Sequence, residues 1–86
     1  MSDALVIHGE RYLTATRVAE LYDVRVEWVR EVCAFGLLEP VEHVADELAI
    51  AARLLDRVAT IHRLNVGQGV ELAAVSVLLD LPEVSP

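Results

Sequence analysis

The stretch TATRVAELYDVRVEWVREVCAFGLLEP, residues 14–40, decides the fold expected for this chain of 86 residues. Thr14 is a good N-cap, because its hydroxyl can accept a hydrogen bond from an unpaired N–H of the first helical turn. Asp23 tolerates the left-handed conformation that ends a helix. A second periodic run of apolar residues follows and stops at Gly36. Two short helices joined by such a turn form a helix-turn-helix unit, here residues 14–36.

The charges of this unit indicate what it can bind. A helix that reads DNA needs cationic and amide side chains, because phosphate neutralisation supplies most of the affinity. Residues 14–40 contain three arginines and five acidic residues, a balance of 3 − 5 = −2. The whole chain has a formal net charge of −7 and a pI near 4.7. This is the opposite of the basic footprint of a nucleic-acid binder, so a basic protein is the more natural partner.

Composition limits the chain to one domain, residues 1–86, with one core. Hydrophobic residues make up 55% of the sequence and aromatic residues only 5%, so Ala, Val and Leu must fill that core. Such an excess of apolar residues indicates that some apolar surface is kept for a partner.

The cellular compartment is predicted from what the sequence lacks. A single cysteine, Cys33, excludes an intramolecular disulfide and fits a reducing compartment. The first residues have no signal-peptide pattern. The longest uncharged apolar run, residues 72–79, is far shorter than a membrane span. We therefore expect a cytoplasmic protein without a membrane segment.

Outside the helix-turn-helix unit, the sequence predicts little β structure. Residues 5–8 are a short β-prone run, read as one small strand or as a hairpin that turns at residues 9–10 into residues 11–13. We expect this strand to pair with the short segment at residues 37–45. Such a two-stranded patch is marginal alone and needs support from helices.

Two further helices are expected. Asp46 is an N-cap candidate for a long helix over residues 46–64, and Pro82 ends a final helix over residues 68–81. The predicted fold class is therefore mainly α, with about four helices and a minimal two-stranded β patch.

The final helix is apolar over about 200° of its circumference, on a wheel of about 100° per residue. A helix this apolar is expected to be buried on two sides, one inside the domain and one against another chain. A homodimer is the simplest such arrangement. Its expected contact face consists of Val70, Ala74, Val77, Leu78 and Leu81.

The motifs of the chain resemble a known family. The exit GLLEP, residues 36–40, matches the end of the second helix in MerR-like winged helix-turn-helix domains. Within that group, residues 12–81 follow the order of the chaperone modulator CbpM family. Two further segments match this family. They are RLNVGQGVELAA, residues 63–74, which connects the two predicted C-terminal helices, and LLDL, residues 78–81. It implies a MerR-type fold in which residues 37–45 form the wing.

The resemblance also implies a function. Proteins of the CbpM family bind the J-domain of a DnaJ-like co-chaperone and regulate its work in the Hsp70 system. A J-domain presents a basic helix, which an acidic surface can attract. The alternatives are a MerR-like DNA-binding transcriptional regulator, which the negative charge disfavours, and a dimeric assembly factor of a chaperone complex.

The partner surface is expected on the helix-turn-helix unit. Trp28 lies about 90–120° around the second helix from its apolar face. It is either an interface anchor with an acidic rim or a seal that folds over the wing at the edge of the core. The predicted partner-binding residues are Glu20, Asp23, Glu27, Trp28 and Glu31.

Catalysis and metal binding have no support in the sequence. His8, His43 and His62 fall in three different predicted elements, and one cysteine cannot complete a zinc site. Cys33 falls on the apolar face, where it behaves as a small hydrophobe. We therefore expect no enzyme, no cofactor and no metal.

Overall fold

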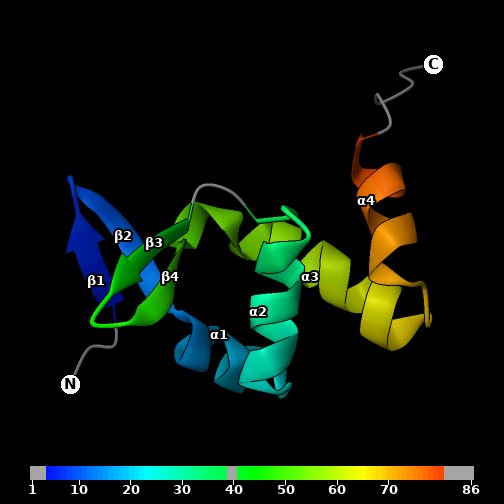
Figure 1. Ribbon diagram of the computed structural model, residues 1–86, viewed down its shortest axis with the longest axis horizontal. Helices are drawn as coiled ribbons and strands as arrows, with labels where there is room; N and C mark the ends of the chain where they lie inside the picture. Colours follow the sequence, from blue (N-terminus) through cyan, green and yellow to red (C-terminus); the bar gives the residue numbers. More distant parts are fainter. Residues whose placement is uncertain (1–3, 39–40, 81–86) are drawn as a thin grey trace.

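The computed structural model describes residues 4–38 and 41–80 (Figure 1). The first half of the chain forms two strands and two helices, and the second half forms two strands and a series of helical segments. The elements are β1 (Ala4–Ile7), β2 (Glu10–Thr14), α1 (Ala15–Tyr22), α2 (Val26–Ala34), β3 (Val41–Val44), β4 (Glu47–Ala51), a 3₁₀ turn η1 (Ala52–Leu54), α3 (Leu55–His62), a π-helical turn η2 (Arg63–Gly67) and α4 (Leu72–Asp80).

The strands form one antiparallel sheet in the order β1-β2-β4-β3. It lies at one end of the molecule, and α4 lies at the other (Figure 1). The predicted fold class is therefore wrong: the protein is mixed α/β with a four-stranded sheet, and not mainly α with a two-stranded patch. The segment after the helix-turn-helix unit is a hairpin of β3 and β4, and it joins the N-terminal hairpin through β2 and not through β1.

Strand β4 occupies the start of the predicted long helix, residues 46–64. The sequence ELAIA of β4 consists mainly of good helix formers, so local propensity favours a helix there. Pairing with β2 and β3 overrides that preference, because it buries Ala49, Ile50 and Ala51 completely. Asp46 is not an N-cap; it lies with Ala45 in a two-residue hairpin turn in which both residues have positive φ.

The helix-turn-helix unit agrees with its sequence signals. The N–H of Arg17 donates to the hydroxyl of Thr14 at 3.1 Å, and α1 begins at the residue after this cap. Asp23 adopts the left-handed conformation with φ 53° and ψ 48°, which ends α1. Gly36 has φ 73° just after α2. These outcomes confirm the predicted start of α1 at Thr14, its end at Asp23 and the stop of α2 before Gly36.

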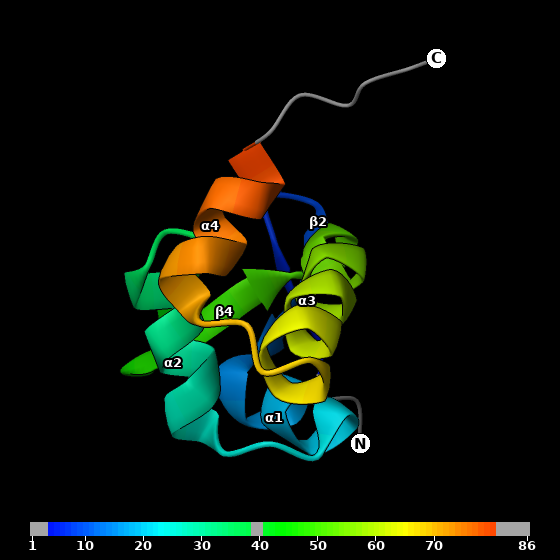
Figure 2. The same ribbon diagram turned by 90° about the vertical axis from the view of Figure 1, so that its right-hand side faces the viewer.

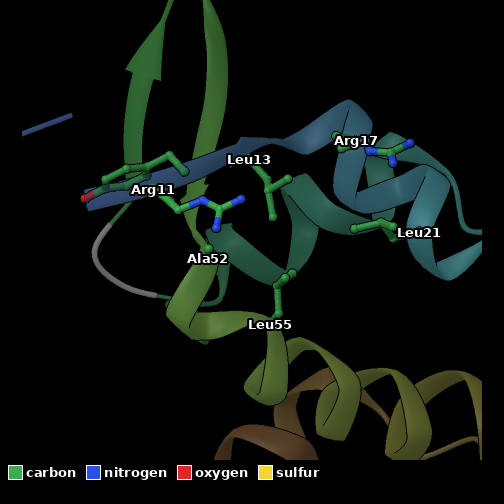
Figure 3. A pocket seen from close by; sticks show the side chains of 7 residues that line it. Arg11, Leu13, Arg17, Leu21, Ala52 and Leu55 are labelled. Carbon is green, nitrogen blue, oxygen red and sulfur yellow. The ribbon is translucent and has the colours of Figure 1, made fainter. Parts of the chain in front are cut away.

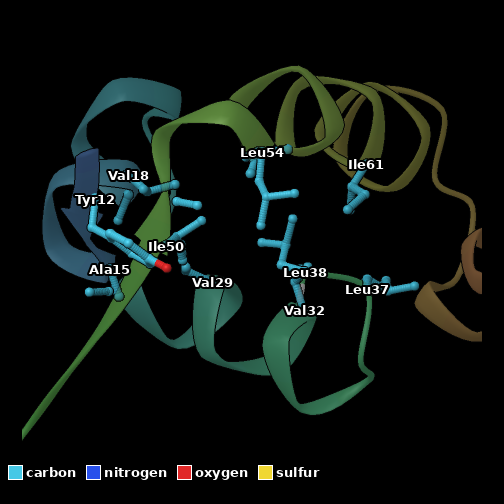
Figure 4. Close-up of a cluster of buried hydrophobic side chains, with 14 of the residues drawn as sticks. Tyr12, Ala15, Val18, Val29, Val32, Leu37, Leu38, Ile50, Leu54 and Ile61 are labelled. Carbon is cyan, nitrogen blue, oxygen red and sulfur yellow. The ribbon is translucent and has the colours of Figure 1, made fainter. Parts of the chain in front are cut away.

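The core lies between the sheet and helices α1, α2 and α3 (Figure 4). Most of its side chains are Val, Leu, Ile and Ala, as the low aromatic content predicts. The buried hydrophobic residues are Tyr12, Ala15, Val18, Ala19, Val29, Val32, Leu37, Leu38, Ala49, Ile50, Ala51, Leu54, Val58, Ile61, Leu72 and Val75.

The C-terminal helix α4 is shorter than predicted at its start. It begins at Leu72 and not near residue 68, and Gly69 precedes it with φ 72°. Helix α4 attaches to the rest of the protein mainly through Leu72 and Val75, beside α2 and α3 (Figure 2). Within residues 4–38 and 41–80, no helix has the length and apolar character needed to cross a membrane.

Candidate protein-binding surfaces

The exposed face of α2 carries three charged side chains, Glu27, Arg30 and Glu31. Glu27 and Glu31 lie one turn apart on it, opposite the buried Val29 and Val32. Two carboxylates are therefore accompanied by one guanidinium on this face.

The other two predicted acidic residues lie near this face but not on α2. Asp23 is in the turn between the two helices, and Glu20 is in the last turns of α1; both are exposed. Glu20 is partly neutralised, because its carboxylate lies 3.3 Å from Nη1 of Arg17.

Trp28 has internal contacts at the back of α2. Its Nε1–H donates to Oδ1 of Asn65 at 2.7 Å, and its ring meets the His62 ring edge-on, with centroids 5.9 Å apart. The side chain is half-buried. Of the two interpretations, these contacts favour the seal, although Trp28 seals α2 against α3 and η2 and not against the hairpin of β3 and β4.

The sequence indicates Asn65 only as a left-handed residue that ends the long helix near residue 64, and its contacts in the structure were not predicted. Its Nδ2 donates to the carbonyl of Val70 at 2.7 Å, while its Oδ1 accepts from Trp28. One amide therefore joins α2, η2 and the segment before α4. Asn65 is not that helix terminator, because it lies inside the π-helical turn η2 and its φ is not positive. The sequence feature that could have indicated these buried hydrogen bonds is a polar amide side chain between apolar residues.

His62 lies between two aromatic side chains. The Tyr22 ring lies tilted by 39° to it with centroids 5.5 Å apart, and the Tyr22 hydroxyl donates to the carbonyl of Leu55 at 3.0 Å. Burial, with a smaller effect of the Asp56 charge, raises the pKa of Tyr22. Together with Trp28, these rings fix α1 and α2 against α3.

Cys33 lies at the other edge of the apolar face of α2. It is half-buried, and burial raises the pKa of its thiol. A thiol with a raised pKa is a poor nucleophile. Among the described residues, no group of three or more His, Cys, Asp and Glu side chains is placed to hold a metal ion.

The predicted dimer face is partly assembled on α4. Ala74, Val77 and Leu78 are exposed, and Val77 is 62% exposed although it is a large hydrophobic residue. Val70 does not belong to this face: it precedes α4 and packs against the core. Leu81 lies outside the described residues. The exposed apolar face of α4 therefore consists of Ala74, Val77 and Leu78.

Several arginines are engaged by groups within the described residues. Arg53 pairs with Glu10 at 2.9 Å, and Arg17 pairs with Glu20. Arg57 donates to the backbone carbonyl of Leu37. The charges of Arg17 and Arg53 are therefore partly offset by carboxylates.

Comparisons of the chain with protein-family models, with curated proteins and with solved structures gave no match.

Proposed function

We propose that this protein is a chaperone modulator that binds the J-domain of a DnaJ-like co-chaperone and regulates its action in the Hsp70 system. The observation that supports this proposal is the pair of exposed carboxylates on α2, Glu27 and Glu31, on the second helix of the helix-turn-helix unit. The motif resemblance of residues 12–81 supplies the partner class.

The physical basis of the binding is electrostatic. An acidic face on a chain of charge −7 attracts a basic helix over roughly a Debye length, about 8 Å at physiological ionic strength. Attraction of this kind raises the association rate and falls with salt. Once bound, the acidic face covers the basic helix of the co-chaperone, and that helix can no longer contact Hsp70.

The rear of α2 makes this face a defined surface. Val29 and Val32 are fully buried, and Trp28 is held by Asn65 and His62. A helix held at its back presents a fixed backbone to the partner, so only the side chains of Glu27 and Glu31 lose conformational freedom on binding.

Binding to an isolated J-domain tests the proposal. We expect retention of the J-domain at low and moderate salt, and an affinity lowered about tenfold by the double variant E27Q/E31Q. The control is E71Q/D80N, which removes the same two charges from the α4 region and is expected to change the affinity less than twofold. Lack of retention even at low salt would refute the proposal.

A gel shift with random duplex DNA separates this function from the DNA-binding alternative. A MerR-like regulator gives a salt-sensitive, non-specific band at low salt. We expect no band, because Glu27 and Glu31 face the side from which the duplex would approach.

The exposed face of α4 favours a second candidate function, a dimeric assembly factor. Val77 is 62% and Leu78 46% exposed, which is unusual for two apolar residues on one short helix. Analytical ultracentrifugation tests it: we expect a dimer that the Val77→Asp variant converts into the 9.5 kDa monomer. The Glu71→Gln variant serves as a control outside the apolar face. A wild-type protein that stays monomeric at all concentrations contradicts this candidate.

A further inference from the structure

A hollow of about 300 Å³ lies between β2, α1 and the start of α3 (Figure 3). It is separate from the exposed face of α2 and from α4. Its size is at the lower end of small-molecule sites, which span roughly 300–1,000 Å³. The lining residues are Arg11, Tyr12, Leu13, Arg17, Leu21, Ala52 and Leu55.

The wall of the hollow is apolar. Leu13 of β2, Leu21 of α1 and Leu55 of α3 come from three different elements and line one space. Leu21 is 50% exposed, although the helix-turn-helix pattern would allow it to join the core. An aliphatic group placed here would remove the exposed surface of Leu21 from water, which is favourable at about 25 cal/mol per Å².

The rim of the hollow is cationic. Arg11 is exposed and forms no side-chain hydrogen bond or ion pair with the residues that the structure describes. The neighbouring arginines are compensated, since Arg17 pairs with Glu20 and Arg53 pairs with Glu10. The uncompensated charge at this rim is therefore positive, in a chain whose net charge is −7.

We propose that this hollow binds a small aliphatic carboxylate. The guanidinium of Arg11 receives the carboxylate through charge-assisted hydrogen bonds, and the hydrocarbon tail lies along Leu13, Leu21 and Leu55. With roughly 30 Å³ for each heavy atom, the space holds about ten of them, the size of a medium-chain monocarboxylate. The inference stands independently of the J-domain proposal, because it uses a different surface.

A titration of the ¹⁵N-labelled chain, followed by amide chemical shifts, tests the proposal. The probes are octanoate, its neutral amide octanamide, and acetate, which has the charge without the tail. We expect saturable octanoate shifts at Arg11, Leu13, Leu21 and Leu55, with a dissociation constant of about 1 mM or below. Octanamide and acetate are expected to bind at least about tenfold more weakly, since each lacks one of the two interactions.

Two variants and one control locate the site. Arg11→Gln is expected to weaken octanoate binding about tenfold, whereas Arg11→Lys, which keeps the charge, is expected to retain most of it. Arg30→Gln removes an exposed arginine on α2 and is expected to have no effect. Equal binding of octanoate and octanamide, or no saturable shift with octanoate, would overturn the proposal. So would shifts centred on Val77 and Leu78, which would indicate adsorption on α4.

Discussion

Replacing Asn65 by alanine should destabilise the protein through two hydrogen bonds at once. Oδ1 of Asn65 accepts from Trp28 and Nδ2 donates to Val70, both at 2.7 Å and both part-buried. A hydrogen bond of this kind contributes about 0.5–1.5 kcal/mol net, so Asn65→Ala should lower the free energy of unfolding by about 1–3 kcal/mol. The free energy of unfolding of a native protein is about 5–15 kcal/mol, so a loss of this size is a substantial part of the total.

Urea unfolding followed by far-ultraviolet circular dichroism measures this loss. Gln68→Ala is the control, because Gln68 is exposed just beyond η2 and a surface substitution there should stay within about 0.5 kcal/mol. Trp28 is the single tryptophan of the chain, so its fluorescence provides a second readout. Its emission should move to longer wavelength in Asn65→Ala, as water replaces the amide.

A double-mutant cycle separates the two bonds. Trp28→Phe removes the indole N–H together with part of the bicyclic ring, and keeps a smaller aromatic ring near His62. The coupling energy between Trp28→Phe and Asn65→Ala should be about 0.5–1.5 kcal/mol, the contribution of one bond. A coupling energy of zero, together with a loss in Asn65→Ala no larger than in Gln68→Ala, would show that Asn65 does not join α2 to η2.

Three further outcomes follow from the structure. Thr14→Ala should lower the free energy of unfolding by about 1 kcal/mol in urea titrations, because the N–H of Arg17 loses its cap; an unchanged midpoint contradicts this. Asp23→Val should cost about 1–2 kcal/mol by the same measurement and Asp23→Gly much less, since φ is 53°; equal losses contradict this. Burial raises the pKa of the Cys33 thiol and of the Tyr22 hydroxyl above their ordinary values, so the neutral forms favour the folded state. Unfolding then releases protons at high pH, and stability should fall as the pH rises above about 9; a flat profile from about pH 7 to 10.5 contradicts this.

Local chemistry explains why the helix-turn-helix unit is predictable from sequence. The cap at Thr14, the left-handed residue Asp23 and the glycine at 36 act within a few residues of the chain. The conformation that each of these residues favours locally is therefore also the one it adopts in the folded protein.

Strand β4 is not predictable in that way, because one of its two partners, β2, is distant in sequence. Tyr12 pairs with Ala51 and Leu13 with Ile50, across almost forty residues. The segment ELAIA favours a helix by propensity, and pairing with both β2 and β3 makes the strand more favourable. The hairpin turn at Ala45 and Asp46 carries no glycine that would have revealed it.

The candidate surfaces also differ in whether they can be predicted from the sequence. The acidic residues of α2 could be placed by helical periodicity alone, because Glu27 and Glu31 are one turn apart. The hollow beside Arg11 could not, because it depends on the packing of β2 against α1 and α3. The contact of Trp28 with Asn65 spans 37 residues and depends on the π-helical turn η2, which no sequence pattern indicates.

The two faces of α2 should therefore respond differently to substitution. Its rear, through Trp28 and Asn65, contributes to stability, whereas its front, through Glu27 and Glu31, contributes charge to the surface. In the proposed function, E27Q/E31Q should slow association with a J-domain and reduce its salt dependence while leaving the urea midpoint nearly unchanged. Asn65→Ala should lower the urea midpoint while leaving that salt dependence intact, because it changes no charge. If both variants changed both quantities together, the partner would contact the rear of α2, and the acidic face would not be the binding surface.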